Sequence, residues 1–425
     1  MKNITESANG ASAPGACLVT NGCPECAMEA AAIEQYLQRD HGMRIIDEAG
    51  HADLIVLLGC SATSQCEDQA RRLIQLIRRR KRSEAELIVA GCIARARPEL
   101  ATRPVRFAHL EGPIQQIIAF SPSTWELGCN RPHDQDRRIL DEAAAPPGHS
   151  LSGRVIGRQL ARYRDRDNSI WNDRDACCIM LCSGCLHRCA YCASKLARGT
   201  LRSKPPELVR KEFEWGLDQG HRRFVLLGGN IGDYGHDLGA DLYDLLDWMN
   251  GIDRTFQLAL HNVHPAWLIE AAPRLRRVIA CGKVACIHSA LQSGSDRMLE
   301  LMNRGHRVGD FLAAIEKIRQ AWPALHVRTE LMVNFPGELE ADFNETMRVL
   351  DGDLFDHVQV FRFEPRPGTA AALMKDPTPE PVLQWRHRRL LVKACVGSPL
   401  KRALGGRRPS PAPGPVRDSR PAAAG

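Results

Sequence analysis

The sequence predicts an α/β protein built from two parallel-sheet units, and three observations support this. In the first hundred residues, short apolar runs alternate with helical stretches. From about residue 176 onward, an alternation of strand and helix repeats through six units. The composition, 44% apolar and 25% charged, is ordinary for a globular protein, and 425 residues leave room for two or three domains. Short strands that alternate with helices are typical of a parallel sheet with helices on its faces.

The first unit is predicted from three apolar runs, at residues 16–20, 53–58 and 86–90, with helices at 27–40 and 66–82 between them. Each run ends close to a Gly-Cys pair, and glycine lets the backbone bend closely around a bulky ligand. The cysteines of these pairs are Cys23, Cys60 and Cys92. The carboxyl ends of parallel strands share one edge, where ligands bind. We therefore expect the three cysteines to converge on a metal cluster, with Cys26 as a rival to Cys23.

A second cysteine group opens the second unit. Cys185, Cys189 and Cys192 form a CxxxCxxC triplet, a spacing expected by chance only about 0.02 times in a chain with this many cysteines. Three thiolates on one loop can hold three irons of a four-iron–four-sulfur cluster and leave the fourth iron open. An open iron can chelate S-adenosylmethionine, and an electron from the cluster can then release a deoxyadenosyl radical.

Zinc is the main alternative at this loop, because Cys182 extends the spacing to C-x2-C-x3-C-x2-C. Zinc ribbons, however, separate their two CxxC pairs by about 15–20 residues, which disfavours zinc. Residues 1–15 lack an apolar signal core, and no apolar run approaches the roughly 20 residues of a membrane helix. We therefore expect a cytoplasmic protein with reduced thiols and no membrane association. Eight further cysteines are expected to be small buried side chains: Cys17, Cys66, Cys129, Cys177, Cys178, Cys281, Cys286 and Cys395.

The net charge is +7, and residues 71–82 form a dense basic stretch. Such a stretch could meet RNA phosphates. The favoured interpretation is the solvated face of an amphipathic helix, with Leu73, Ile74 and Ile77 directed inward. Charge alone therefore does not decide the partner.

The second unit is predicted from six strands and five helices. The strands are expected at 176–182, 222–228, 255–261, 284–290, 326–333 and 357–363, and the helices at 206–219, 240–250, 265–274, 309–321 and 339–351. Polar residues share one face of two strands: Gln257 and His261, and Arg328, Glu330 and Asn334 with Met332. Polar side chains that point into a barrel need a ligand or one another. A pairing of Arg328 with Glu330 remains the structural alternative to a site.

With these features in place, the chain resembles the radical-SAM methylthiotransferases, which modify tRNA adenosines or a ribosomal-protein aspartate. The resemblance covers roughly residues 15–385 and includes six further segments. They are Leu226-Leu227-Gly228-Gly229-Asn230, Val263-His264-Pro265, Leu291-Gln292-Ser293-Gly294-Ser295, Met302-Asn303-Arg304-Gly305, Asn334-Phe335-Pro336-Gly337-Glu338 and Pro365-Arg366-Pro367-Gly368-Thr369.

The resemblance implies an N-terminal domain at residues 15–125 and a radical-SAM core, a partial (β/α)6 barrel, at 171–385. Residues 1–14 are expected to be disordered, 126–170 to be a linker, and 386–425 to be a helical remnant with a low-complexity tail. Family members normally end with a small β-barrel, the TRAM domain, which we do not expect in this composition.

The resemblance also implies the binding site for S-adenosylmethionine. The candidate contacts are Tyr191, Gly228, Gly229, Asn230, His264, Gln292, Ser293, Glu330 and Asn334. Two of them depart from the family pattern: Gly229 stands where relatives usually have an amide-bearing residue, and Asn334 replaces a glycine. Asn230 could accept a hydrogen bond from the methionine amino group through its carbonyl oxygen.

The activity that the resemblance implies is insertion of a methylthio group at an unactivated C–H bond, with two four-iron clusters and S-adenosylmethionine. One S-adenosylmethionine methylates a sulfur held at Cys23, Cys60 and Cys92, and a second supplies the radical. The default substrate is C2 of an N6-modified adenosine in tRNA, and an external low-potential donor supplies electrons. The alternatives are a ribosomal protein, a peptide or a small molecule as substrate, or a cobalamin-type radical methylase.

Overall fold

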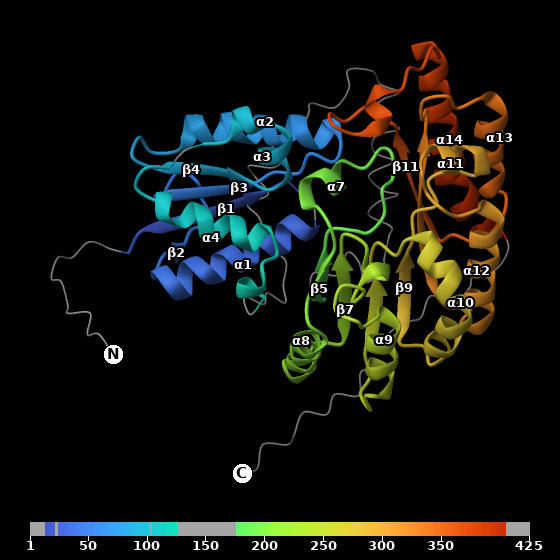
Figure 1. Cartoon of the computed structure of the whole chain (residues 1–425), viewed down its shortest axis with the longest axis horizontal. Coiled ribbons are helices and arrows are strands. Elements are labelled where there is room, and N and C mark those ends of the chain that lie inside the picture. The colour runs from blue at the N-terminus through green and yellow to red at the C-terminus, as the bar shows by residue number, and fades with distance from the viewer. Residues whose placement is uncertain (1–12, 22–23, 103, 126–175, 405–425) are drawn as a thin grey trace.

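The computed structural model describes residues 13–21, 24–102, 104–125 and 176–404, and side chains of this set up to residue 395. Two sheets organise these residues, one in each half of the chain (Figure 1). Cys23, Cys129, residues 1–12 of the expected N-terminal segment, the expected linker at 126–170 and the tail beyond residue 404 lie outside the described residues. No helix within the described ranges combines the length and the apolar character needed to cross a bilayer.

The N-terminal sheet is fully parallel, in the order β2-β1-β3-β4. Its strands are β1 (Gly15–Thr20), β2 (Arg44–Ile45), β3 (Leu54–Leu58) and β4 (Glu86–Ala90). Helices α1 (Pro24–His41) and α4 (Ala108–Ile118) cover one face, and α2 (Ser64–Arg80) and α3 (Cys92–Ala96) cover the other (Figure 1). The three expected strands and two expected helices are confirmed, and β2, α3 and α4 are additions.

Alternating side chains explain this three-layer arrangement. In β1, Ala16 and Leu18 pack under α1 and α4, whereas Cys17 and Val19 pack under α2. Helix α2 buries the three expected apolar residues, Leu73, Ile74 and Ile77, and leaves Arg78, Arg79 and Arg80 exposed. The amphipathic interpretation of the basic stretch is therefore confirmed.

The second sheet has seven strands in the order β11-β10-β9-β8-β7-β5-β6. Six are parallel: β5 (Cys177–Ser183), β7 (Arg223–Gly228), β8 (Gln257–Leu260), β9 (Val284–His288), β10 (His326–Val333) and β11 (His357–Arg362). The short β6 (Arg202–Ser203) pairs antiparallel with β5 at one edge. This is the expected six-unit, partial barrel, open between β11 and β6.

Helices cover the outer face of these strands. They are α8 (Pro206–Asp218), α9 (Leu242–Gly251), α10 (Pro265–Ala280), α12 (Val308–Ala321), α13 (Glu340–Val349) and α14 (Glu380–Leu404), with the short α7 (Ala193–Arg198) and α11 (Asp296–Leu301) at the loops. In β10, Val327, Leu331 and Val333 face this helical layer, as expected. Glu330 lies on the opposite face.

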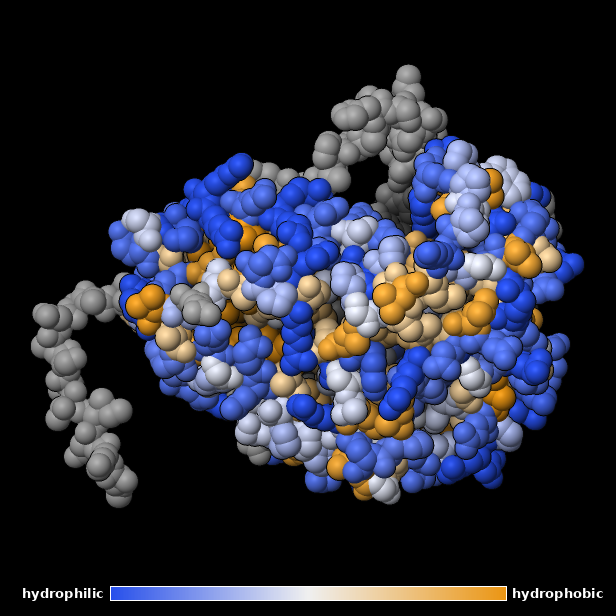
Figure 2. Space-filling view, turned by 45° about the horizontal axis from the view of Figure 1, so that its top comes forward, coloured by the Kyte–Doolittle hydropathy of each residue, from blue (hydrophilic) through white to orange (hydrophobic). Residues whose placement is uncertain are grey.

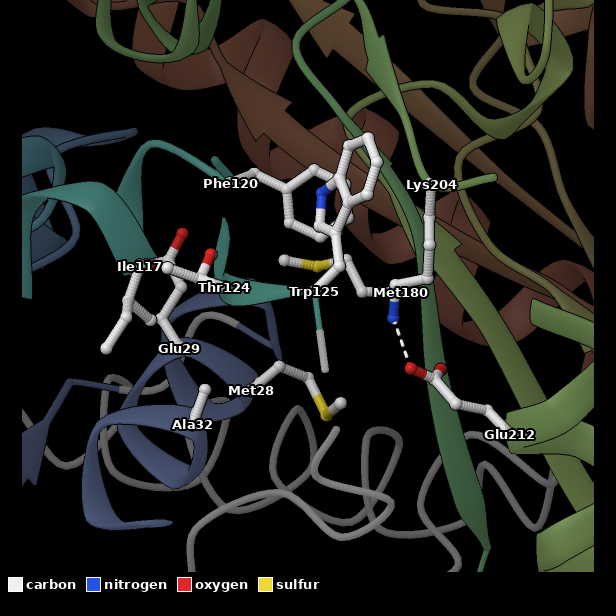
Figure 3. Close-up of a pocket in the computed structure, with 10 residues that line it drawn as sticks. All are labelled: Met28, Glu29, Ala32, Ile117, Phe120, Thr124, Trp125, Met180, Lys204 and Glu212. Carbon is white, nitrogen blue, oxygen red and sulfur yellow. Dashed lines mark hydrogen bonds and ion pairs between the residues drawn. The ribbon is translucent and has the colours of Figure 1, made fainter. Parts of the chain in front are cut away.

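The two units share an apolar core. Met28 of α1 and Phe120, which follows α4, pack against inner-face residues of the barrel such as Met180 and Leu227. A cavity of about 40 Å³ remains beside this contact (Figure 3). It has room for a few water molecules and is too small for a nucleotide, so it is a gap in the interface.

The expected burial of the eight additional cysteines holds for most of those described and is wrong for Cys281. Cys17, Cys177, Cys178 and Cys286 are buried, Cys66 and Cys395 are partly buried, and Cys281 is exposed at the end of α10. Its thiol donates to the carbonyl of Val278 there, 2.9 Å away. No disulfide joins any two of the described cysteines.

Candidate active site

The CxxxCxxC residues form a loop between β5 and α7, at the carboxyl edge of the barrel. The N–H of His187 points at Cys185 Sγ, 3.4 Å away, and the N–H of Lys195 points at Cys192 Sγ, also 3.4 Å away. Backbone donors aimed at sulfur stabilise thiolate over thiol. The loop therefore suits iron–sulfur ligation, which needs deprotonated cysteines.

A buried arginine reaches this loop from a distant part of the chain. Arg304 Nη1 lies 3.3 Å from Cys189 Sγ, while Nη2 donates to the carbonyl of Ala290 at 2.5 Å. Its Nε has no partner among the described residues. The positive charge of Arg304 therefore lies next to the sulfur of Cys189 and can stabilise negative charge on it.

Asp233 holds the opposite end of the loop. Its carboxylate accepts the N–H of Leu186 at 2.8 Å, and it lies 3.5 Å from Cys185 Sγ and 3.4 Å from His187 Nε2. Burial opposes ionisation of Asp233, but the bonds from His187 and Leu186 hold its pKa below the ordinary value. Burial, followed by the charge of Asp233, raises the pKa of the Cys185 thiol to about 12. Without iron, Cys185 is therefore a thiol, and iron binding must release its proton.

Sequence reasoning did not assign a role to Asp233 or Arg304. Asp233 lies three residues beyond the Gly228-Gly229-Asn230 segment, and Arg304 lies inside the Met302-Asn303-Arg304-Gly305 segment. For Arg304, the match of this segment to the family was the available indication. Its contact with Cys189 joins residues that are 115 positions apart.

The glycines that end β7 allow close backbone approach to the cysteine loop. A Cβ added to Gly229 would lie 2.4 Å from the carbonyl oxygen of Gly184, and one added to Gly228 would lie 2.7 Å from that of Cys182. Real side chains do not tolerate such contacts with backbone atoms. The unusual glycine at position 229 therefore has a steric reason in this chain.

Asn230 lies in the expected region, but the side-chain atom that it leaves for a ligand is the amide nitrogen and not the expected carbonyl oxygen. Its Oδ1 accepts the N–H groups of Gly232 at 3.2 Å and His264 at 3.0 Å. Its Nδ2 is buried and makes no hydrogen bond of ordinary length among the described residues, although it lies near enough to Asp233 to help lower the pKa of that carboxyl. The atom available to a ligand is thus a donor, which suits a carboxylate better than the amino group expected from the sequence.

His264 stacks on His187 of the cysteine loop, with ring centroids 3.6 Å apart. Its Nδ1 accepts the N–H of Ala266, and its Nε2 is buried without a partner among the described residues. Burial, together with the charges of Arg304, His187 and His306, holds the pKa of His264 far below its ordinary value. The ring is therefore neutral, and Nε2 carries its proton as a donor.

Glu330 and Gln292 line the inner face beside this edge. Glu330 is bonded by His288 Nε2 and by Gln292 Nε2, each at 3.3 Å, so the alternative of a simple pair with Arg328 does not describe its contacts. Gln292 has a φ of +74° and leaves Oε1 buried without a partner among the described residues. The lumen therefore presents several unsatisfied polar atoms, the arrangement expected where a polar ligand binds.

Three predicted contacts are placed in other surroundings. Ser293 is bonded to Thr346 of α13 at 3.2 Å, and Asn334 donates through Nδ2 to the carbonyl of Leu383 in α14 at 2.8 Å. Tyr191 is partly buried and packs edge-on against Phe335. These side chains support the walls of the site.

The zinc alternative finds no support in this arrangement. Cys182 is fully buried within β5, and its Sγ lies 3.4 Å from the carbonyl of Asn230.

The dispersed cysteines Cys60 and Cys92 lie at adjacent strand ends of the N-terminal sheet. Cys60 lies two residues after Leu58 of β3, and Cys92 lies two residues after Ala90 of β4. Leu58 and Ala90 pair directly across the two strands. The intervening Gly91 has a φ of +77°, which favours glycine. Cys23 lies outside the described residues, and its rival Cys26 packs in the apolar layer between α1 and the sheet.

One ion pair links this edge to the radical-SAM loop. Arg198, at the end of the helix that begins after Cys192, contacts Glu29 of α1 at 2.6 Å. Both side chains are at least nine-tenths buried. Helix α3 begins at Cys92 and contacts α7, so Cys92 lies near this junction.

The surface around the junction is largely hydrophilic, with apolar side chains gathered in patches (Figure 2). Leu186, which lies within the cysteine loop, and Leu196 of α7 are about half exposed.

Comparison with known proteins agrees with this geometry. Residues 179–350 match the model of the radical SAM superfamily, and residues 16–109 match the uncharacterized protein family UPF0004. The chain is 30% identical over 339 residues to the threonylcarbamoyladenosine tRNA methylthiotransferase MtaB of Thermotoga maritima, covering 78% of this chain and 71% of that protein. It is 30% identical over 369 residues to the tRNA-2-methylthio-N(6)-dimethylallyladenosine synthase of Dictyoglomus thermophilum, covering 85% and 78%.

Among solved structures, the fold is similar to the radical S-adenosylmethionine methyltransferase TsrM of Kitasatospora setae. The TM-score is 0.53 at 13% identity, over 85% of this chain and 77% of that one. The cysteine loop, the family models and the relatives agree that this chain is an enzyme that uses a four-iron–four-sulfur cluster and S-adenosylmethionine, and it belongs to the radical-SAM methylthiotransferase family.

Proposed function

We propose that this enzyme inserts a methylthio group at C2 of an N6-modified adenosine in tRNA. The observation that carries the proposal is the placement of Cys60 and Cys92 at adjacent strand ends, joined through α1 and α7 to the radical-SAM loop. The relatives named above act on adenosines of tRNA, which supports the substrate.

We assign the radical-SAM cluster to Cys185, Cys189 and Cys192, and an auxiliary cluster to Cys23, Cys60 and Cys92, with Cys26 as the alternative to Cys23. When bound, the first cluster with S-adenosylmethionine supplies the radical, and the second supplies sulfur. The chain's own part is to hold the cofactors in place. Arg304 and Asp233 fix the two ends of the first loop, and Gly229 lets the β7 backbone approach it.

The polar atoms of the lumen are suited to the methionine end of S-adenosylmethionine. Asn230 Nδ2 and neutral His264 Nε2 are donors that can face its carboxylate, and Gln292 Oε1 can accept from its amino group. Glu330, held by His288 and Gln292, fixes Gln292 in place. We further propose a reducing, cytoplasmic setting and an external low-potential electron donor.

The test is an anaerobic assay of the reconstituted enzyme that measures deoxyadenosine and methylthiolated nucleoside. A Cys23/Cys60/Cys92 triple alanine variant should still form deoxyadenosine but transfer no sulfur, and its iron content should fall from about eight to about four per chain. Sulfur transfer by this variant would refute the assignment of the auxiliary cluster.

The substrate is tested separately by mass spectrometry of tRNA nucleosides from a deletion strain. Loss of a methylthio-adenosine is the expected result. An unchanged profile would favour a protein or peptide substrate. Cobalt-dependent absorbance of the purified enzyme, together with only one iron–sulfur cluster, would instead indicate a cobalamin-type methylase.

A further inference from the structure

Residues 364–371, which we call the bridge segment, follow β11 and contain Pro365-Arg366-Pro367-Gly368-Thr369. On one side they contact the radical-SAM loop. The N–H of Ala371 donates to the carbonyl of Ala190, between Cys189 and Cys192, at 2.9 Å. Gly368, with a φ of +82°, packs so close to α7 that an added Cβ would lie 3.0 Å from Leu196.

On its other side, the bridge segment contacts the first turn of α2. Arg366 is buried, and its Nη2 lies 2.5 Å from Glu67 Oε2. Two residues earlier, the carboxylate of Glu364 accepts the N–H of Ser64 at 2.6 Å. The barrel thus contacts α2 through both a charge pair and a backbone group.

The first turn of α2 is in turn bonded to the loop that carries Cys60. The carbonyl of Cys66 accepts from Asn21 Nδ2 at 2.7 Å, and Asn21 Oδ1 accepts the N–H of Cys60 at 2.6 Å. A connected polar path therefore runs from Ala190, through Arg366 and Glu67, to Cys60.

Glu67 is the centre of this path. Besides Arg366, it contacts Arg97 Nε at 2.6 Å and Arg71 Nη2 at 3.1 Å, both from its own unit. Burial works against ionisation, but the bonds from Arg97, Arg366 and Arg71 hold the pKa of Glu67 below its ordinary value. Among these three guanidinium groups, the one that crosses from the barrel is Arg366.

We propose that Arg366 is a positioning residue that fixes the Cys60 loop relative to the Cys185–Cys192 loop through Glu67. This inference rests on the proposed function, because sulfur transfer requires both loops to face one substrate. The shared apolar core around Met28 and Phe120 holds the units together independently. Loss of Arg366 should therefore shift the Cys60 loop without separating the units.

Arg366→Gln is the test variant, and Arg71→Gln is the matched control. Both remove one guanidinium from the same carboxylate, but Arg71 reaches it from within α2. In the reconstituted holoenzyme, we expect Arg366→Gln to form deoxyadenosine within about twofold of the wild type. Its methylthiolated product should fall by roughly a hundredfold, the scale of a misplacement of about 1 Å. Arg71→Gln should keep the wild-type ratio of product to deoxyadenosine.

Two readouts do not depend on product formation. Hydrogen exchange of the amides in residues 60–67 should accelerate in Arg366→Gln and not in Arg71→Gln. The magnetic interaction between the two reduced clusters, seen by EPR, should also change only in Arg366→Gln. Unchanged exchange and an unchanged product ratio in Arg366→Gln would overturn the proposal.

The two proposals fail in different ways. If the wild type holds a single cluster or forms no methylthio product, the proposed function is refuted. Hydrogen exchange then decides the positioning role alone: acceleration confined to Arg366→Gln supports it, and equal exchange in both variants refutes it. If Arg366→Gln loses its iron, Arg366→Lys, which keeps the charge, should restore both the iron and the slow exchange. Failure of that rescue would refute the role of the charge pair.

Discussion

Arg304 Nη1 lies 3.3 Å from Cys189 Sγ, so a cation from 115 residues further along the chain contacts one proposed ligand of the radical-SAM cluster. Hydrogen bonds and charge near cluster sulfurs set the reduction potential. A hydrogen bond to a charged group is worth about 1.5–3 kcal/mol, which corresponds to roughly 65–130 mV for one electron.

Arg304→Met should therefore lower the potential of the radical-SAM cluster by roughly this amount, because the reduced, more negative cluster loses its cation. An anaerobic redox titration followed by EPR measures the shift. Arg307→Met is the control, since Arg307 is exposed and pairs with Asp296. An unchanged or raised potential in Arg304→Met would contradict the assigned contact.

Gly229→Ala should weaken the cysteine loop, because the new Cβ would lie 2.4 Å from the carbonyl oxygen of Gly184. We expect a loss of about 1–3 kcal/mol in the free energy of unfolding and reduced iron content. Gly309→Ala is the control, since nothing lies within 4 Å of its added Cβ in α12. Equal iron content and equal stability in the two variants would show that the loop accommodates a side chain.

Asn334 has a φ of +66°, a conformation that glycine adopts freely and alanine does not. Asn334→Gly and Asn334→Ala both lose the bond to Leu383 of α14, but only alanine adds backbone strain of about 1 kcal/mol. Anaerobic urea unfolding should rank the wild type first, glycine second and alanine third. A variant with alanine as stable as the one with glycine would rule out the strain.

Glu338 gives the protein a pH-dependent stability. Burial is the main cause that raises its pKa to about 7, and the nearby carboxylates of Asp342 and Asp376 add to this, while the N–H of Asn334 and the charge of Arg386 oppose it. Because the folded pKa is above the unfolded one, the stabilising contribution is present at low pH. It is lost as the pH rises through about 7.

Glu338→Gln should therefore flatten the fall in unfolding free energy between about pH 5 and about pH 8, a change of up to about 3 kcal/mol. Unfolding at several pH values measures it, with Glu340→Gln as the exposed control on the neighbouring turn. The same slope in Glu338→Gln and in the wild type would assign the pH dependence to other groups.

Strand positions were predictable from the sequence because the alternation of side chains is local. The expected strand at 326–333 coincides with β10, in which apolar residues face the helices. Helix ends were harder to predict. The helix expected at 265–274 continues to Ala280, because Leu275, Val278 and Ile279 pack into the core and compensate for the internal Pro273.

The roles of single site residues depended on contacts that no local pattern encodes. Cysteine spacing predicted the radical-SAM loop, but Asp233 and Arg304 reach it from 48 and 115 residues away. Asn334 matched a family segment, yet its amide is directed to α14, whose extent was not expected. The assignment of Cys23 remains a prediction.

The contact of Met28 and Phe120 with the inner strands of the barrel has a consequence for how the molecule melts. Neither unit can unfold without exposing apolar surface of the other to water. Heating should therefore produce one transition in which both sheets unfold together. A fragment that starts at residue 176 would expose the apolar inner face of the barrel to water, and we expect it to aggregate.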